Sequence, residues 1–146
     1  MIEKNIIANI PIDQAWTLWS TSDGLKTFFG QDNNFELSKG GPFEIYFDMS
    51  QPPGLRGSED CKVIDFIPQK MLSFTWNAPL SILEIRNSGY KTTVAVFFKS
   101  IDDGKTEIKL IHHGFMEGEK WIEYKKYFEN AWDIVLQWFN PNNSPL

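Results

Sequence analysis

The chain has 146 residues, of which 42% are apolar and 15% aromatic, and its net charge is −5. This length is typical of one domain with a real hydrophobic core, so we expect a single domain over residues 1–146. The negative charge and the lack of any run of Lys or Arg argue against a nucleic-acid partner. One cysteine, Cys61, excludes an internal disulfide, and no apolar run is long enough to span a membrane. The sequence therefore predicts a cytoplasmic protein with no membrane insertion.

The N-terminal part predicts one strand and two short helices. Residues 2–10 alternate imperfectly between apolar and polar side chains, and Pro11 ends this strand. Apolar side chains then recur at helical spacing over residues 12–19. The polar run of residues 20–24 breaks this helix and can cap a second one, which Gly30 ends.

From residue 35 the apolar period changes to two, which predicts antiparallel strands joined by turns. A shift of parity near Cys61 suggests a β-bulge, and Asp102-Asp103-Gly104 is typical of a hairpin turn. The segment of residues 77–90 carries Pro and Gly, so we expect a loop that covers apolar surface. The predicted strands are residues 35–37, 43–47, 56–66, 71–76, 92–100 and 106–113.

The longest helical pattern covers Lys120–Phe139, a run without Gly or Pro. A helix this aromatic must lie on a broad apolar surface. We therefore expect an α+β fold in which a curved antiparallel sheet of about six to seven strands surrounds this C-terminal helix. The apolar stripe of the helix consists of Trp121, Tyr124, Phe128, Ala131, Val135 and Trp138, and it is widened by Tyr127, Trp132, Leu136 and Phe139.

Several motifs in a fixed order resemble one known family. They are AWTLWS at 15–20 with DGL and FFG after it, GGPF at 40–43, PQKMLSFTW at 68–76, LIHHGF at 110–115, and the closing helix with Trp132. Together they resemble the START-like (SRPBCC) superfamily, and within it the branch named after the activator of heat-shock protein 90 ATPase. Phe28 departs from the pattern, because the family usually has Trp there. The resemblance implies a helix-grip fold with a cavity between sheet and helix, but no single activity.

His112 and His113 are the only histidines in the sequence. Neighbouring residues on a strand point to opposite faces, so the pair cannot ligate one metal, and we assign no metal, cofactor or catalytic residue. His112 shares parity with Ile108 and Leu110, which directs it toward the helix. It is then either a polar group of a cavity or a core histidine bonded to a neighbour. Cys61 lies among carboxylates, which predicts an unreactive thiol.

These observations predict a protein that binds a small apolar or amphipathic molecule between the sheet and the C-terminal helix. His112, Trp76 and Tyr124 would be its polar anchors, and the two short helices and residues 80–90 its mouth. The expected ligand-binding residues, each of which is otherwise a core residue, are Phe28, Phe29, Phe47, Phe74, Trp76, Phe98, His112, Trp121, Tyr124 and Phe128.

Two other functions remain open from the sequence. One is a cyclase- or hydrolase-like enzyme with His112 as its acid or base. The other is a chaperone-associated or stress-response interaction module. We also expect a homodimer if part of the aromatic C-terminal helix is exposed.

Overall fold

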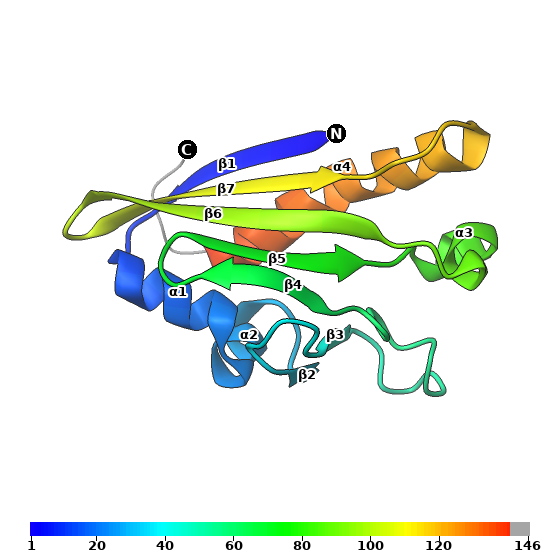
Figure 1. Cartoon of the computed structure of the whole chain (residues 1–146), viewed down its shortest axis with the longest axis horizontal. Coiled ribbons are helices and arrows are strands. Elements are labelled where there is room, and N and C mark those ends of the chain that lie inside the picture. The colour runs from blue at the N-terminus through cyan, green and yellow to red at the C-terminus, as the bar shows by residue number, and fades with distance from the viewer. Residues whose placement is uncertain (141–146) are drawn as a thin grey trace.

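The computed structural model describes residues 1–140; the remaining six positions of the expected domain lie outside the described residues. Figure 1 shows strands packed in one layer, with the long C-terminal helix α4 crossing behind them. The elements in chain order are β1 (Ile2–Ala8), α1 (Ile12–Ser20), α2 (Ser22–Phe28), β2 (Asp32–Phe35), β3 (Phe43–Tyr46), β4 (Val63–Ile67), β5 (Met71–Trp76), η1 (Leu80–Ile82), α3 (Leu83–Ser88), β6 (Thr92–Asp102), β7 (Lys105–His113) and α4 (Glu119–Phe139).

Five antiparallel strands form the main sheet in the order β1-β7-β6-β5-β4, and β2 pairs with β3 in a separate hairpin. Backbone hydrogen bonds join this hairpin to the segment before β4: Phe43 N donates to Cys61 O at 2.8 Å, and Val63 N donates to Gly41 O at 2.8 Å. The hairpin therefore continues the surface of the sheet around the helix. The predicted α+β helix-grip fold with its long C-terminal helix and short N-terminal helices is confirmed.

The two short helices α1 and α2 meet at a tight corner. The Thr21 hydroxyl accepts a hydrogen bond from Gly24 N at 3.0 Å and so caps α2, as the polar run predicted. A Cβ atom on Gly24 would lie 2.5 Å from the Leu18 Cα, so the corner requires glycine. The close approach brings Trp19 of α1 and Phe28 of α2 into contact, with ring centroids 4.9 Å apart.

The core lies between the concave face of the sheet and α4. On the helix, the buried side chains are Tyr124, Phe128, Trp132, Val135, Leu136 and Phe139. The predicted stripe and the positions that widen it include all six of these residues, but two of its members, Trp138 and Tyr127, are 48% and 45% exposed.

Three segments differ from the sequence prediction. The strand expected at residues 35–37 is observed as β2 at Asp32–Phe35. The strand expected over residues 56–66 begins at Val63, although a register shift between Val63 and Asp65 confirms the bulge. The segment of residues 77–90, expected to be a loop, contains η1 and α3. Gly89 ends α3 in the left-handed conformation at φ 80°, which suits glycine after a helix. Ile82 and Ile85 of this segment are buried, so it does cover apolar surface.

Candidate ligand pocket

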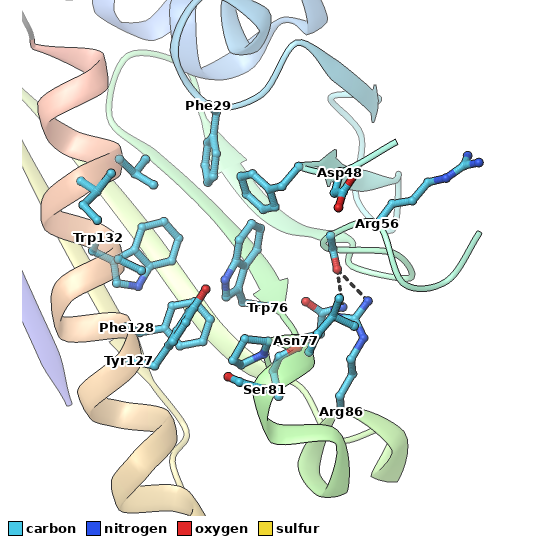
Figure 2. Close-up of a pocket in the computed structure, with 18 of the residues that line it drawn as sticks. Phe29, Asp48, Arg56, Trp76, Asn77, Ser81, Arg86, Tyr127, Phe128 and Trp132 are labelled. Carbon is cyan, nitrogen blue, oxygen red and sulfur yellow. Dashed lines mark hydrogen bonds between the residues drawn. The ribbon is translucent and has the colours of Figure 1, made fainter. Parts of the chain in front are cut away.

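A hollow of about 510 Å³, here called the pocket, lies between the C-terminal half of α4, the end of β5 and the loop of residues 47–57. Figure 2 shows Phe128 and Trp132 of α4 facing Trp76 across it. A volume of this size fits a small organic molecule. The lining residues are Phe29, Phe47, Asp48, Leu55, Arg56, Gly57, Trp76, Asn77, Ala78, Pro79, Leu80, Ser81, Arg86, Tyr127, Phe128, Ala131, Trp132, Ile134, Val135 and Trp138.

The deep wall of the pocket is aromatic. The Trp76 ring centroid lies 5.4 Å from that of Trp132 and 5.6 Å from that of Phe29, and both pairs are tilted. Trp76, Phe29 and Trp132 are each less than 5% exposed, so the rings are fixed by packing on their outer sides. The pocket therefore has a rigid, apolar base.

One charged group holds the loop side of the pocket in place. The Arg86 guanidinium donates hydrogen bonds to the carbonyl oxygens of Ala78 at 2.8 Å, Gly54 at 2.7 Å and Gly57 at 2.9 Å. It also forms an ion pair with Glu59 at 3.3 Å, and both side chains are largely buried. Arg86 thus ties α3 to the loop that borders the pocket.

Glu59 organises the same loop from its other side. Its carboxylate accepts hydrogen bonds from the backbone N–H groups of Gly54 at 2.5 Å, Arg56 at 2.9 Å and Gly57 at 2.7 Å. Burial raises the pKa of Glu59, but these backbone donors together bring it below its usual value. A Cβ atom at Gly57 would lie 2.0 Å from the Ile45 carbonyl oxygen, so this part of the loop lies directly on β3.

Of the charged groups at the mouth, Asp48 is exposed and Arg56 is partly exposed. Asp48 accepts hydrogen bonds from the hydroxyl and backbone N–H of Ser50, which lower its pKa. Arg56 donates from Nε to Gln51 O at 2.8 Å, and Figure 2 shows its guanidinium extending away from Trp76. The mouth therefore carries charged groups beside exposed apolar side chains such as Phe47 and Trp138, while the base of the pocket is aromatic.

His112 lies in the core behind the pocket and completes a hydrogen-bond network. The Trp132 indole N–H donates to His112 Nδ1 at 2.9 Å, and His112 Nε2 lies 2.6 Å from Thr92 Oγ1. The Tyr124 hydroxyl lies 2.9 Å from Thr92 Oγ1, which in turn donates to Trp76 O at 3.2 Å. The network joins β5, β6, β7 and α4.

The donors of this network fix the state of the imidazole. An indole nitrogen only donates, so His112 Nδ1 must accept and the proton of the neutral ring sits on Nε2. Burial, followed by the nearby charges of His113 and the N-terminus, lowers the pKa of His112 to about 3. Burial also raises the pKa of Tyr124. His112 is therefore a neutral structural residue with both ring nitrogens engaged.

Four of the ten residues expected to bind ligand line the pocket: Phe29, Phe47, Trp76 and Phe128. The other six are not on its wall. Two of the three expected polar anchors, His112 and Tyr124, bond instead to Thr92 in the core network. The His112 side chain faces the helix, as parity predicted. It does not line the pocket, because Trp132 lies between the imidazole and the pocket.

Packing explains where the remaining expected residues lie. Phe74 is stacked on Phe43 with centroids 3.8 Å apart. Phe98 packs edge-on against Trp16. Phe28 packs against Trp19 and Phe139. Trp121 borders a second, shallower hollow beside α3, which it shares with Tyr90, Glu84 and Glu119.

Sequence reasoning missed most of the loop and rim residues of the pocket. Leu55 and Asn77 carry no periodic signal, since they lie outside regular elements, and Arg56 was assigned to a strand that in fact begins at Val63. Trp132 was detectable, because it follows Phe128 by one helical turn on the same face. Of residues 80–90, which were expected to border the mouth, Leu80, Ser81 and Arg86 lie on the pocket wall. From the two short helices, which were expected there too, the wall includes only Phe29 at the end of α2.

The described residues offer few other chemical groups. Within residues 1–140, no three His, Cys, Asp or Glu side chains gather as they would around a metal ion. Cys61 is buried, and burial raises the pKa of its thiol to about 12. None of the helices described over this range has the length and apolar character needed to cross a membrane.

Comparisons with solved structures place the fold among helix-grip proteins. The Aha1 dimer from Colwellia psychrerythraea superimposes with a TM-score of 0.71 at 16% identity, over 95% of this chain and 92% of that one. Protein MLL2253 from Mesorhizobium loti gives 0.70 at 17% identity, over 94% and 93%. PFC0360w, an HSP90 activator from Plasmodium falciparum, gives 0.68 at 18% identity, over 93% and 90%. A search of curated proteins gave no significant match.

The family to which the motifs pointed is confirmed by its sequence profile. Residues 9–139 match the family described as Activator of Hsp90 ATPase homolog 1-like protein. This range includes the α1–α2 corner, every strand from β2 to β7 and the whole of α4. The chain therefore belongs to the Activator of Hsp90 ATPase homolog 1-like protein family.

Proposed function

We propose that this protein binds a small, largely apolar molecule in the pocket between the loop of residues 47–57 and α4. The observation that carries the proposal is the aromatic base, in which Trp76, Phe29 and Trp132 border open volume rather than filling it. Apolar surface that a ligand removes from water contributes roughly 25 cal/mol per Å² before the costs of binding. Family membership agrees with such a role but names no ligand.

An enzyme that uses His112 as acid or base is the less favoured alternative. A general base must reach the proton that it removes, directly or through one water molecule. His112 is fully buried, its nitrogens bond to Trp132 and Thr92, and it is not among the residues of the pocket wall. Binding without chemistry at His112 is therefore the function that the geometry supports best.

The proposal is tested by filling the pocket from its helix wall. Ala131 lines the pocket, whereas the preceding residue, Asn130, is exposed and is not part of the pocket wall. N-phenyl-1-naphthylamine is a neutral apolar probe whose fluorescence rises on leaving water. We expect the wild-type protein to bind one probe molecule, Ala131→Trp to weaken binding at least tenfold, and Asn130→Trp to bind as wild type.

Two results would contradict ligand binding in this pocket. One is a wild-type protein that does not bind the probe, and the other is binding that Ala131→Trp leaves unchanged. Native mass spectrometry of protein purified from its own host gives an independent measurement. We expect a co-purifying small molecule that is displaced by the probe.

A second candidate function is contact with a chaperone, which the family match and one solved relative favour. The relative from Plasmodium falciparum is described as an HSP90 activator. Ile134 and Trp138 of α4 are 47% and 48% exposed beside the pocket, and they offer an apolar surface to a protein partner. Binding of the host's Hsp90-class chaperone that Trp138→Glu abolishes, with no co-purifying small molecule, would favour this function.

The same exposed side chains meet the condition under which a homodimer was expected. The relative from Colwellia psychrerythraea is described as a dimer. We propose that any dimer of this chain uses the Ile134 and Trp138 side of α4. Light scattering of wild type and Trp138→Glu measures this directly, and a dimer mass that the variant retains would refute it.

A further inference from the structure

The indole N–H of Trp76 is a buried hydrogen-bond donor without a protein partner. Trp76 is the last residue of β5 and only 4% exposed. Among residues 1–140 its Nε1 donates to no protein acceptor, and yet it is not one of the polar atoms sealed from solvent. Since Trp76 lines the pocket, the route to this nitrogen runs through the pocket. Figure 2 shows the nitrogen on the edge of the ring that is turned toward α4.

The three other buried tryptophans differ from Trp76 in this respect. Trp16, which is 9% exposed, packs on Phe98 and does not line the pocket. Trp132 Nε1 donates to His112 Nδ1, so it is already paired. Trp19 Nε1 has no partner within the described residues, but it is fully enclosed by the core and does not border the pocket. Buried tryptophans usually find an acceptor for their N–H. Trp76 is thus the deep indole that is both unpaired and open to a ligand.

The charges around the pocket favour a neutral acceptor over an anionic one. Arg86 is committed to three backbone carbonyl oxygens and to Glu59, and the Arg56 guanidinium extends away from Trp76. No lysine is among the lining residues described, and Asp48 places a negative charge at the mouth. A carboxylate beside Trp76 would lose its water without gaining a counter-ion.

We propose that the Trp76 Nε1–H selects a neutral, largely apolar ligand that carries a carbonyl oxygen, such as a ketone, ester or lactone. This inference rests on the proposed function and adds the chemical class of the ligand. The aromatic base binds the carbon skeleton of the ligand, and the hydrogen bond from Trp76 Nε1–H to the carbonyl oxygen orients the ligand. The Ser81 and Tyr127 hydroxyls lie on the exposed rim, where water competes for them.

The test uses three probes of nearly the same shape. They are 2-acetylnaphthalene, which has a carbonyl, 2-ethylnaphthalene, which has no acceptor, and 2-naphthoate, which is charged. The measured quantity is the ratio of the acetyl to the ethyl affinity, because the ratio removes the part of binding that both skeletons share. Trp76→Phe keeps an aromatic ring and removes the N–H. We expect this change to lower the ratio about fivefold, which is the effect of one neutral hydrogen bond.

The matched control is Trp121→Phe, which removes an indole that is not part of this pocket wall. It should leave the acetyl-to-ethyl ratio unchanged, and the wild type should bind 2-naphthoate more weakly than 2-acetylnaphthalene. The indole N–H signals of the six tryptophans give a second measurement that needs no variant. The Trp76 signal should move downfield with the acetyl probe and less with the ethyl probe.

The outcomes separate the two proposals. If no probe binds the wild type, the proposed function fails and this inference with it. Suppose instead that the acetyl and ethyl probes bind, but Trp76→Phe leaves the ratio of their affinities unchanged or the Trp76 signal responds equally to both. The proposed function is then retained, and the hydrogen-bond inference is overturned. Tighter binding of 2-naphthoate than of 2-acetylnaphthalene overturns the preference for a neutral ligand.

Discussion

His112 makes the stability of the fold sensitive to acid. Its folded pKa of about 3 lies below the ordinary value of 6.5, because burial disfavours the charged ring. Between these values the unfolded chain binds a proton that the folded chain does not. The stabilisation is therefore complete above pH 6.5 and is lost as the pH falls toward 3, with a slope of about 1.4 kcal/mol per pH unit from this group.

The prediction is measured by urea unfolding at pH 7 and pH 5. His112→Gln removes the titrating group, so the variant should lose about 2 kcal/mol less stability than the wild type between these two pH values. His113→Gln is the matched control, because it removes the neighbouring exposed imidazole. Equal acid sensitivity of wild type and His112→Gln would refute the assignment.

Residue parity explains how far the sequence predicted this network. The alternation of β7 correctly directed His112 toward the helix, since its neighbours Ile108 and Leu110 are also buried. Parity gives the face of a strand but not the partner opposite. Thr92 and Trp132 are each 20 residues away in the chain, so their contacts with His112 depend on the pairing of β6 with β7 and on the placement of α4.

At the level of elements, the connection between α3 and the loop of residues 54–59 depends on Arg86. A lysine at this position keeps the charge, but it cannot reach the Ala78, Gly54 and Gly57 carbonyls with the planar geometry of a guanidinium. We expect Arg86→Lys to lower the free energy of unfolding by roughly 1–3 kcal/mol. The backbone amides of residues 54–59 should also exchange faster, as measured by hydrogen–deuterium exchange.

The control for this prediction is Arg56→Lys. Arg56 lies on the same loop, but among residues 1–140 its side chain donates a single hydrogen bond, to Gln51 O. The variant should keep the stability and the exchange of the wild type. Exchange in residues 54–59 that is the same for Arg86→Lys and wild type would show that the loop does not depend on Arg86.

The same region shows why short elements are hard to predict. The six residues of α3 contain one buried apolar side chain, Ile85, which is too few to reveal a helical period. Gly89, in the left-handed conformation after α3, was the available signal, because glycine often follows a helix. The 21 residues of α4, by contrast, repeat their apolar period over several turns.

At the level of the whole molecule, the sheet and α4 depend on each other. The six buried side chains of α4 contribute about 1.5–3 kcal/mol each, which together is comparable with the roughly 5–15 kcal/mol stability of an entire domain. We therefore expect a chain of residues 1–118 to remain unfolded. Loss of dispersed amide signals in an NMR spectrum would be the result, and a well-dispersed spectrum would contradict it.

The overall fold followed from the sequence better than the pocket did. Alternating strands, turns and one long aromatic helix define the helix-grip arrangement, because each has a strong local signal. The pocket depends on how far the loop of residues 47–57 stands from α4, which Arg86 and Glu59 decide through contacts distant in the chain. The alternation of β5 predicted that Trp76 faces inward. That its N–H has no partner within the described part of the chain could not be predicted, because this depends on every side chain packed around the ring.

The pairing of β1 with β7 has a consequence for how the protein is made. Ile2 lies opposite His112, so 110 residues (112 minus 2) separate two partners in the same sheet. On a ribosome that adds about 5–20 residues per second, β1 waits about 5–20 s before its partner has been synthesised. Its buried side chains, Ile2, Ile6 and Ala8, stay uncovered for that time. Folding is therefore expected to begin only near the end of translation, when a chaperone that holds the nascent N-terminal segment would have the greatest effect.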